Sequence, residues 1–236
     1  MSNQSDSLLT KVYSGSYTFA GGSIGGVLEK NGGGSLTLSS ANAFTFGSVR
    51  GGPNSQDAGA LQIGNFAALG SGPLSFGHVA GITGIYFLPS AGSGTLPNDI
   101  SLPSPTHAIT TRLLTDQTNL TVTLGGILSG GSATHELLID NDSSSNDIGK
   151  IRLSNSANTF TSSRVRINRG GLVVTSDAAL GNLANDLNLD VTSDLANSGL
   201  VLEGSVNLGA DRSVIISSQT VIDTQDTPDV VSGPLT

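Results

Sequence analysis

The sequence contains no cysteine and no tryptophan, and it is poor in aromatic and charged residues. The absence of cysteine excludes disulfides and thiolate metal ligands, and it suits a protein that crosses an oxidising compartment. Only 4% of the residues are aromatic and 12% are charged. A compact domain of ordinary composition has about twice that share of charges, so we expect an unusual core built from small and aliphatic side chains.

The chain also lacks a basic stripe and a long apolar run. It has 10 basic residues against 18 acidic ones, a net charge of -8, which argues against nucleic acid as a partner. Its first residues resemble no export signal, and no apolar stretch is long enough to span a bilayer. We therefore expect any membrane attachment to depend on an anchor or barrel domain absent from this sequence.

Glycine, serine, threonine and asparagine are abundant, with 32 glycines among 236 residues. These turn-forming residues separate short segments in which apolar and polar residues alternate, a pattern typical of strands with one buried face. The pattern predicts an all-β fold. The apolar pairs are Leu36/Leu38, Leu61/Ile63, Leu74/Phe76, Ile100/Leu102, Val122/Leu124, Leu137/Ile139, Ile151/Leu153, Val165/Ile167, Leu172/Val174, Leu187/Leu189, Leu200/Leu202, Val206/Leu208 and Val214/Ile216.

An internal repeat distinguishes a solenoid from a sandwich or a barrel. Residues 35–45 (SLTLSSANAFT) match residues 150–161 (KIRLSNSANTFT). A second block follows each copy in the same order: GALQIG and AALG in the first, GGLVVT and AALG in the second. Repeats that keep their strands and vary in their loops are typical of stacked coils.

The repeats predict one solenoid segment over residues 1–236, built of imperfect repeats at about 17–120 and 121–236. A third pairing sets residues 119–130 beside residues 229–236, where the second copy stops within the motif. We therefore expect an excerpt of a longer array.

Residues 26–39 (GVLEKNGGGSLTLS) and 41–45 (ANAFT) resemble the autotransporter-associated β-strand repeat of bacterial passenger domains. The second copy departs from the family pattern, with DIGK at residues 147–150 and Ser162-Ser163 in place of a double glycine. The resemblance implies a right-handed parallel β-helix that is exported to the cell surface. The positions that match the pattern are Lys30, Gly32, Gly34, Leu36, Leu38, Ser39, Asn42 and Thr45.

The stacking of coils predicts which side chains are buried, which face outward and which lie at the corners. We expect Leu36, Leu38, Ile151, Leu153, Leu172 and Val174 to be buried. Thr37 and Arg152 should face outward. Phe44 and Phe160 should stack near coil corners, where Asn42 and Asn158 occupy equivalent positions and join an asparagine stack or cap a turn.

The densest acidic cluster is DNDSSSND at residues 140–147. Its alternating oxygen donors resemble the start of a calcium loop, but the central glycine and the closing glutamate are missing, because position 151 is Ile. The sequence therefore favours a solvated loop over a calcium site and leaves both readings open. A second acidic group lies in a segment rich in turn-forming residues. It consists of Asp177, Asp186, Asp190 and Asp194.

Other polar residues also receive structural interpretations. Arg164 and Arg166 should form the solvated side of a strand whose other face carries Val165 and Ile167, and Arg169 follows on the same strand. His78, His107 and His135 are isolated, and we expect them in loops or on the surface. The sequence predicts no catalytic residue, no cofactor site and no metal site.

The leading functional hypothesis is a non-catalytic structural or adhesive passenger-type segment of an exported bacterial cell-surface protein, located outside the cell. One alternative is a carbohydrate-binding or polysaccharide-degrading β-helix, with a groove on a lateral face built by the loop insertions expected at residues 51–59, 88–99 or 141–147. Another is a self-assembling fibre or surface-layer subunit. The expected partners are neighbouring repeats of the same chain, with a host surface, a glycan or a second copy as further candidates.

Overall fold

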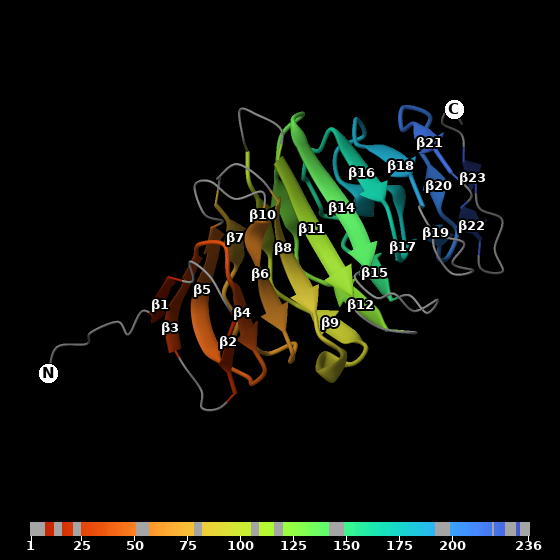
Figure 1. The fold of residues 1–236 in the computed structure, drawn as a ribbon. Helices are drawn as coiled ribbons and strands as arrows, with labels where there is room; N and C mark the ends of the chain where they lie inside the picture. Colours follow the sequence, from red (N-terminus) through yellow and green to blue (C-terminus); the bar gives the residue numbers. More distant parts are fainter. Residues whose placement is uncertain are drawn as a thin grey trace, which may run out of the picture.

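The computed structural model shows a solenoid of parallel strands (Figure 1). Every strand pair in its three large sheets is parallel, and each chain segment returns to the same sheet one coil later. The strands of the longest sheet, named sheet B below, run downward across the front of Figure 1 while successive coils advance from left to right, so the winding is right-handed. The structure describes residues 8–11, 16–20, 25–50, 57–77, 82–104, 109–115, 120–141, 149–191, 199–218, 220–224 and 230–231.

Sheet B runs the length of the solenoid and contains nine strands, which at ~4.8 Å per coil form a stack about 40 Å long. No break separates the two sequence repeats in this sheet, because β11 (Ile109–Thr115) pairs with both β8 (Ile82–Phe87) and β14 (His135–Asn141). The strands of sheet B are β2 (Ser16–Phe19), β4 (Ser35–Leu38), β6 (Asp57–Ile63), β8 (Ile82–Phe87), β11 (Ile109–Thr115), β14 (His135–Asn141), β16 (Arg164–Ile167), β18 (Asp186–Leu189) and β21 (Val214–Ile216).

Sheet A forms a second side of the N-terminal and middle coils, and sheet C forms a further side of the middle and C-terminal coils. Sheet A consists of β1 (Leu8–Lys11), β3 (Gly25–Asn31), β5 (Ala43–Arg50), β7 (Leu74–Phe76), β10 (Ile100–Leu102) and β13 (Leu128–Gly130). Sheet C consists of β9 (Gly94–Leu96), β12 (Thr121–Leu124), β15 (Lys150–Leu153), β17 (Gly171–Val174), β19 (Gly199–Leu202) and β22 (Val221–Asp223).

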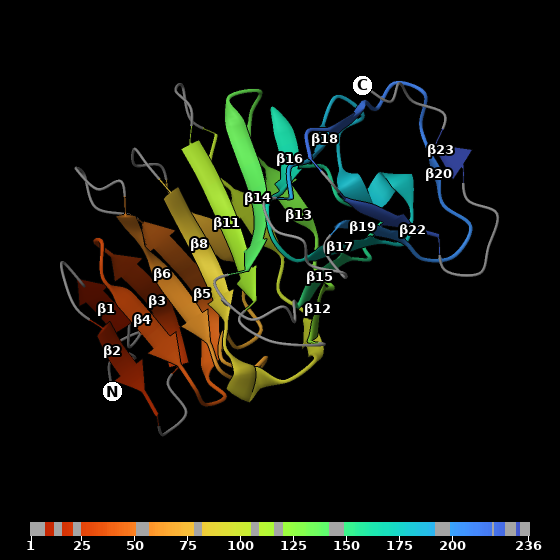
Figure 2. The same ribbon diagram turned by 45° about the vertical axis from the view of Figure 1, so that its right-hand side comes forward.

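A short fourth sheet and two 3-10 turns complete the described elements. Strands β20 (Asn207–Leu208) and β23 (Val230–Val231) pair with each other, and Figure 2 shows them standing across from sheets B and C at the C-terminal end. The 3-10 turns are η1 (Pro89–Ala91) and η2 (Asp177–Leu180). The described residues include no α-helix, so the predicted all-β parallel β-helix is confirmed.

The core is a set of aliphatic columns, each made by residues that occupy the same position in successive coils. In sheet C, Ile151 lies in register with Val122 and Leu172, and all three are buried. The six residues expected inside are at most 1% exposed. Of the apolar pairs found in the sequence, only Ile216 is exposed, at 43%, and it lies on the last strand of sheet B.

Thr37 faces outward, as expected, but it is only 8% exposed. Its hydroxyl donates a hydrogen bond of 2.6 Å to the side-chain oxygen of Gln62, which occupies the same outer position in the next coil. A long side chain in the neighbouring coil therefore covers an outward residue. Burial in a solenoid depends on the adjacent coil as well as on the side of the strand.

The asparagine corners of the two repeats make the same contact with the coil that follows. The side chain of Asn42 donates to the carbonyl of Ala68 at 2.9 Å, and that of Asn158 donates to the carbonyl of Ala179 at 2.7 Å. These carbonyls lie in the two AALG motifs that match in the sequence. The corner is thus a structural repeat in which each asparagine binds the next corner, although the strand before it lies in sheet B in the first copy (β4) and in sheet C in the second (β15).

The glycine that ends each AALG motif is required by the close approach of the preceding coil. Gly70 has a φ of +66°, and a Cβ there would lie 2.4 Å from the backbone of Phe44. Gly181 has a φ of +71°, and a Cβ there would lie 2.6 Å from the Phe160 carbonyl. Both phenylalanines are fully buried, so each ring fills a corner of the core, as expected. The expected stacking of these two rings is not found, because the stacked ring pair among the described residues is Phe66 with Phe87.

Residues 88–99 were expected to form a loop insertion, and this expectation is wrong. The segment contains η1 and the first strand of sheet C, β9, which pairs with β12. Leu96 lies in β9 and is fully buried. The strand has only three residues, and the Gly, Ser and Pro around it are typical of loops, so the sequence pattern did not indicate it. Most of residues 51–59 and 141–147 lie outside the described residues.

We predict that Asn158→Ala destabilises the fold by about 2–4 kcal/mol, because it leaves the buried Leu128 N–H and the Ala179 carbonyl without their partners. The matched control is Asn182→Ala, since that exposed side chain accepts only from the backbone of Ala184. Urea unfolding of both variants measures the difference. Equal losses of stability in the two variants would contradict the role given to the corner asparagine.

Candidate functional site

The outer face of sheet B carries a ladder of ion pairs. Glu136 lies between Arg164 and Arg166 of the next coil and binds both, with 3.0 Å between Arg166 Nη2 and Glu136 Oε1. Val165 and Ile167 are buried on the opposite side of the strand, which confirms the expected outward placement of the two arginines. They do more than face solvent, because they neutralise a glutamate that is only 7% exposed.

Asp140 is the first residue of the acidic cluster at residues 140–147, and its carboxylate is already bound. Arg112 Nη2 lies 3.1 Å from Asp140 Oδ2, and the Asn168 amide donates to Asp140 Oδ1 at 3.3 Å. A carboxylate held by a guanidinium is a poorer calcium ligand than a free one. Residues 142–147 lie outside the described residues.

The second acidic group is dispersed among different structural roles. Asp177 binds the fully buried Arg212 at 2.8 Å and lies in η2, where turn chemistry was expected. Asp190 lies 3.6 Å from Arg166. Asp186 occupies the position in register with Arg164. Asp194 lies outside the described residues. Two of these acids, Asp177 and Asp190, therefore pair with arginines of neighbouring coils.

His135 was expected in a loop or on the surface, and this expectation is wrong. It begins β14 and is fully buried inside the solenoid, where its Nε2 lies 3.0 Å from the hydroxyl oxygen of Thr111. Its Nδ1 has no hydrogen-bond partner. Burial lowers the pKa of His135 to about 4, although the nearby Glu136 carboxylate acts in the opposite direction. His78 and His107 lie outside the described residues.

Lys30 is a second buried ionisable residue. It points into the solenoid from β3, is fully buried, and donates to the carbonyl of Gly32 at 2.5 Å. Burial lowers the pKa of its ammonium to about 8. Because Val49 fills the same position in the next coil, the amine has an apolar neighbour and one carbonyl partner.

The candidate site is a hollow of about 240 Å³ on the outer face of sheet C, here named the sheet C hollow. It forms because glycine occupies one outer column of the sheet: Gly171 and Gly199 lie in register with Lys150 and leave the space beside that side chain open. The lining residues are Thr121, Lys150, Arg152, Val173, Val201 and Glu203.

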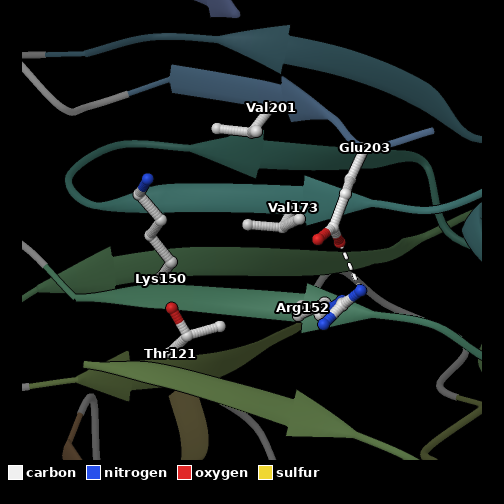
Figure 3. A pocket seen from close by; sticks show the side chains of 6 residues that line it. All are labelled: Thr121, Lys150, Arg152, Val173, Val201 and Glu203. Atoms are coloured by element: carbon white, nitrogen blue, oxygen red, sulfur yellow. Dashed lines mark ion pairs between the residues drawn. The ribbon is translucent and has the colours of Figure 1, made fainter. Parts of the chain in front are cut away.

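Figure 3 shows two valines at the centre of the hollow and polar groups around them. Val173 and Val201 lie in register on successive strands and are only 6% and 5% exposed. The Lys150 side chain rises on one side of them, and an ion pair between Arg152 and Glu203 stands on the other. The hollow therefore combines an aliphatic floor with a charged rim.

The two cations of the rim differ in their partners. Arg152 reaches past one coil to Glu203, two coils away, and both side chains are about one-third exposed, at 34% and 36%. The Nε of Arg152 is buried and has no hydrogen-bond partner. Lys150 has no hydrogen bond or ion pair to its ammonium among the described residues. One positive charge of the hollow is consequently uncompensated.

Comparison with known proteins identifies no relative. The chain matches no family model, no curated protein and no solved structure. Among the residues that the structure describes, no group of three or more His, Asp or Glu side chains is placed to hold a metal ion, and no helix has the length and apolar character needed to cross a membrane. The geometry of the described residues is therefore the basis for assigning a function.

Arg152 faces outward, as predicted from the sequence, but no sequence pattern indicated the sheet C hollow. The signal lies in the alignment of three strand sequences: KIRL at residues 150–153, GLVV at 171–174 and GLVL at 199–202. Aligned in this register, they place two glycines beside Lys150 and two valines beside Arg152. Finding the site from sequence thus requires knowing which strands are neighbours.

We predict that acidification destabilises the protein partly through His135. Its pKa is about 4 in the folded state and ~6.5 when unfolded, so the unfolded chain binds more protons between these values. The stability associated with neutral His135 is complete above pH ~6.5 and declines toward pH 4, by roughly 3 kcal/mol. The measurement is urea unfolding from pH 7 to pH 4 for wild type and His135→Leu.

The leucine variant serves as the control for other titrating groups, because the carboxylates remain in both proteins. Wild type should lose stability relative to His135→Leu as the pH falls. Parallel pH curves for the two proteins would show that His135 does not titrate with a lowered pKa.

Proposed function

We propose that this chain is a structural, passenger-type segment of an exported bacterial cell-surface protein, with a scaffold or adhesive role and no catalysis of its own. The observation that carries this proposal is the uninterrupted stack of nine strands in sheet B. Each added coil lengthens such an object by ~4.8 Å without altering the coils already formed. A molecule of this kind provides reach and a long lateral surface.

The charges of the described coils support a scaffold over a hydrolase. A polysaccharide-cleaving site needs two carboxylates that are free to act on one bond. On sheet B, Glu136 and Asp140 are instead bound by arginines. At the corner of η2, Asp177 is bound by Arg212. These acids connect neighbouring coils, which is a structural use of charge.

The sequence composition supports export. The chain has no cysteine, so it carries no thiol that could be oxidised outside the cytoplasm. The first repeat also resembles the passenger-domain β-strand repeat, and in the structure its residues form β3, β4 and β5. Exported solenoids of that kind fold outside the cell, where each coil stacks on the one before.

Neighbouring repeats are the proposed primary partners. Tyr17 lies on the first strand of sheet B, in the column that Leu36 continues, and it is 58% exposed. Ile216 lies on the last strand, in register with the buried Leu189, and it is 43% exposed. Apolar residues exposed on the end strands are suited to contact a further coil, from the same chain or from a second copy.

Antibodies against this segment should label intact cells of the organism that makes the natural protein, because the proposal places the solenoid outside the cell. Fluorescence of intact and permeabilised cells measures the accessible fraction, and external protease should remove the signal from intact cells. A cytoplasmic protein probed in parallel controls for lysis. Labelling that appears only after permeabilisation would overturn the proposed location.

A further inference from the structure

We propose that the sheet C hollow binds a small organic monoanion with a carboxylate next to a hydrocarbon face, and specifically a uronate unit of an acidic glycan. This inference goes beyond the scaffold function and does not depend on it. It rests on the charge, shape and size of the hollow, each of which restricts the ligand independently.

The charge of the hollow selects an anion. Lys150 has no partner for its ammonium among the described residues, while Arg152 is paired with Glu203. The lining holds two cations and one carboxylate, a charge of about +1 on a protein whose net charge is -8, and the next carboxylate, Asp223, lies one coil beyond Val201. One uncompensated positive charge matches one carboxylate, and it attracts that group against the negative field of the whole molecule.

The floor of the hollow selects a ligand with an apolar side. Val173 and Val201 present methyl groups between Lys150 and the Arg152–Glu203 pair. A ligand that replaces the water over these methyl groups makes a favourable contact with them only if it contributes C–H groups of its own. Inorganic phosphate has no such surface, whereas one face of a sugar ring consists largely of C–H groups.

The rim provides partners for hydroxyl groups. The Glu203 carboxylate accepts hydrogen bonds, the buried Nε of Arg152 is a donor without a partner, and the Thr121 hydroxyl can do either. A simple aliphatic carboxylate has no hydroxyl groups, so it would form no such hydrogen bonds with the rim. A uronate carries hydroxyls around the ring in addition to its carboxylate, so it matches the whole lining.

The size of the hollow limits the ligand to a single ring. Its volume of about 240 Å³ is below the ~300–1,000 Å³ of pockets that hold drug-sized molecules. The hollow lies on the lateral face of sheet C, between strands β12 and β19. One unit of a longer acidic polysaccharide can therefore enter it while the rest of the polymer follows the outside of the solenoid.

The test is a titration of the purified 236-residue protein with D-galacturonate, followed by calorimetry or by NMR shifts of the sheet C amides. Galactose, butyrate and inorganic phosphate are titrated in parallel. Galacturonate should bind saturably with a dissociation constant of about 1 mM or tighter, at least tenfold more tightly than each of the other three. The galactose arm tests the carboxylate, and the butyrate and phosphate arms test the ring.

Two variants test the residues assigned to the rim. Lys150→Met removes the uncompensated charge and should weaken galacturonate binding at least tenfold, while Arg169→Met, which removes one positive charge outside the hollow, should change it less than twofold. Glu203→Gln frees the charge of Arg152 and should strengthen binding severalfold. Circular dichroism of each variant verifies the fold, and the gain expected for Glu203→Gln remains measurable if Lys150→Met fails to fold.

Several results would overturn the proposal. The absence of saturable galacturonate binding, or equal binding of galactose, would show that the uncompensated charge does not select a ligand. Equal binding of butyrate or phosphate would remove the sugar from the assignment. Unchanged affinity in Lys150→Met, or weaker binding in Glu203→Gln, would place the ligand elsewhere. None of these outcomes bears on whether the segment is displayed on the cell surface.

Discussion

The structure depends on parallel pairing of each strand with the equivalent strand of the next coil, in a register that shifts only within the β3–β5 and β6–β8 pairs of the described strands. This pairing satisfies the backbone hydrogen bonds and brings equivalent side chains together ~4.8 Å apart. The burial of each residue therefore depends on the residues at the same position in the neighbouring coils. Val122, Ile151 and Leu172 form one such column, and every member is buried because the next member covers it.

The same constraint determines where polar groups can be accommodated. Inside the solenoid, His135 lies beside Thr111, and at the corner Asn158 bonds to the coils on both sides. Outside, Glu136 connects to the arginines of the next coil. The sheet C hollow follows the same rule, because two glycines in one outer column leave Lys150 without a neighbour that would fill the space or neutralise the charge.

The architecture could be predicted from the sequence because apolar alternation and the repeated corner motif are local signals. Strand β11 was not found, since its inward positions include Thr111 and Thr115, which resemble outward residues in a linear pattern. The burial of His135 was missed for the same reason. The hollow lay beyond sequence reasoning, because its lining comes from strands about 20 to 30 residues apart whose register no local pattern specifies.

Cysteine cross-linking tests this register most directly, since the chain has no cysteine of its own. Thr95 and Thr123 are register partners on the outer face of sheet C, and Thr121 lies two residues before Thr123 on the same face. The pair Thr95→Cys and Thr123→Cys should form a disulfide in the folded protein, because neighbouring partners lie within the ~4.4–6.8 Å Cα range of disulfides. The pair Thr95→Cys and Thr121→Cys should not. Equal oxidation of the two pairs, or faster oxidation of the second, would contradict the in-register stack.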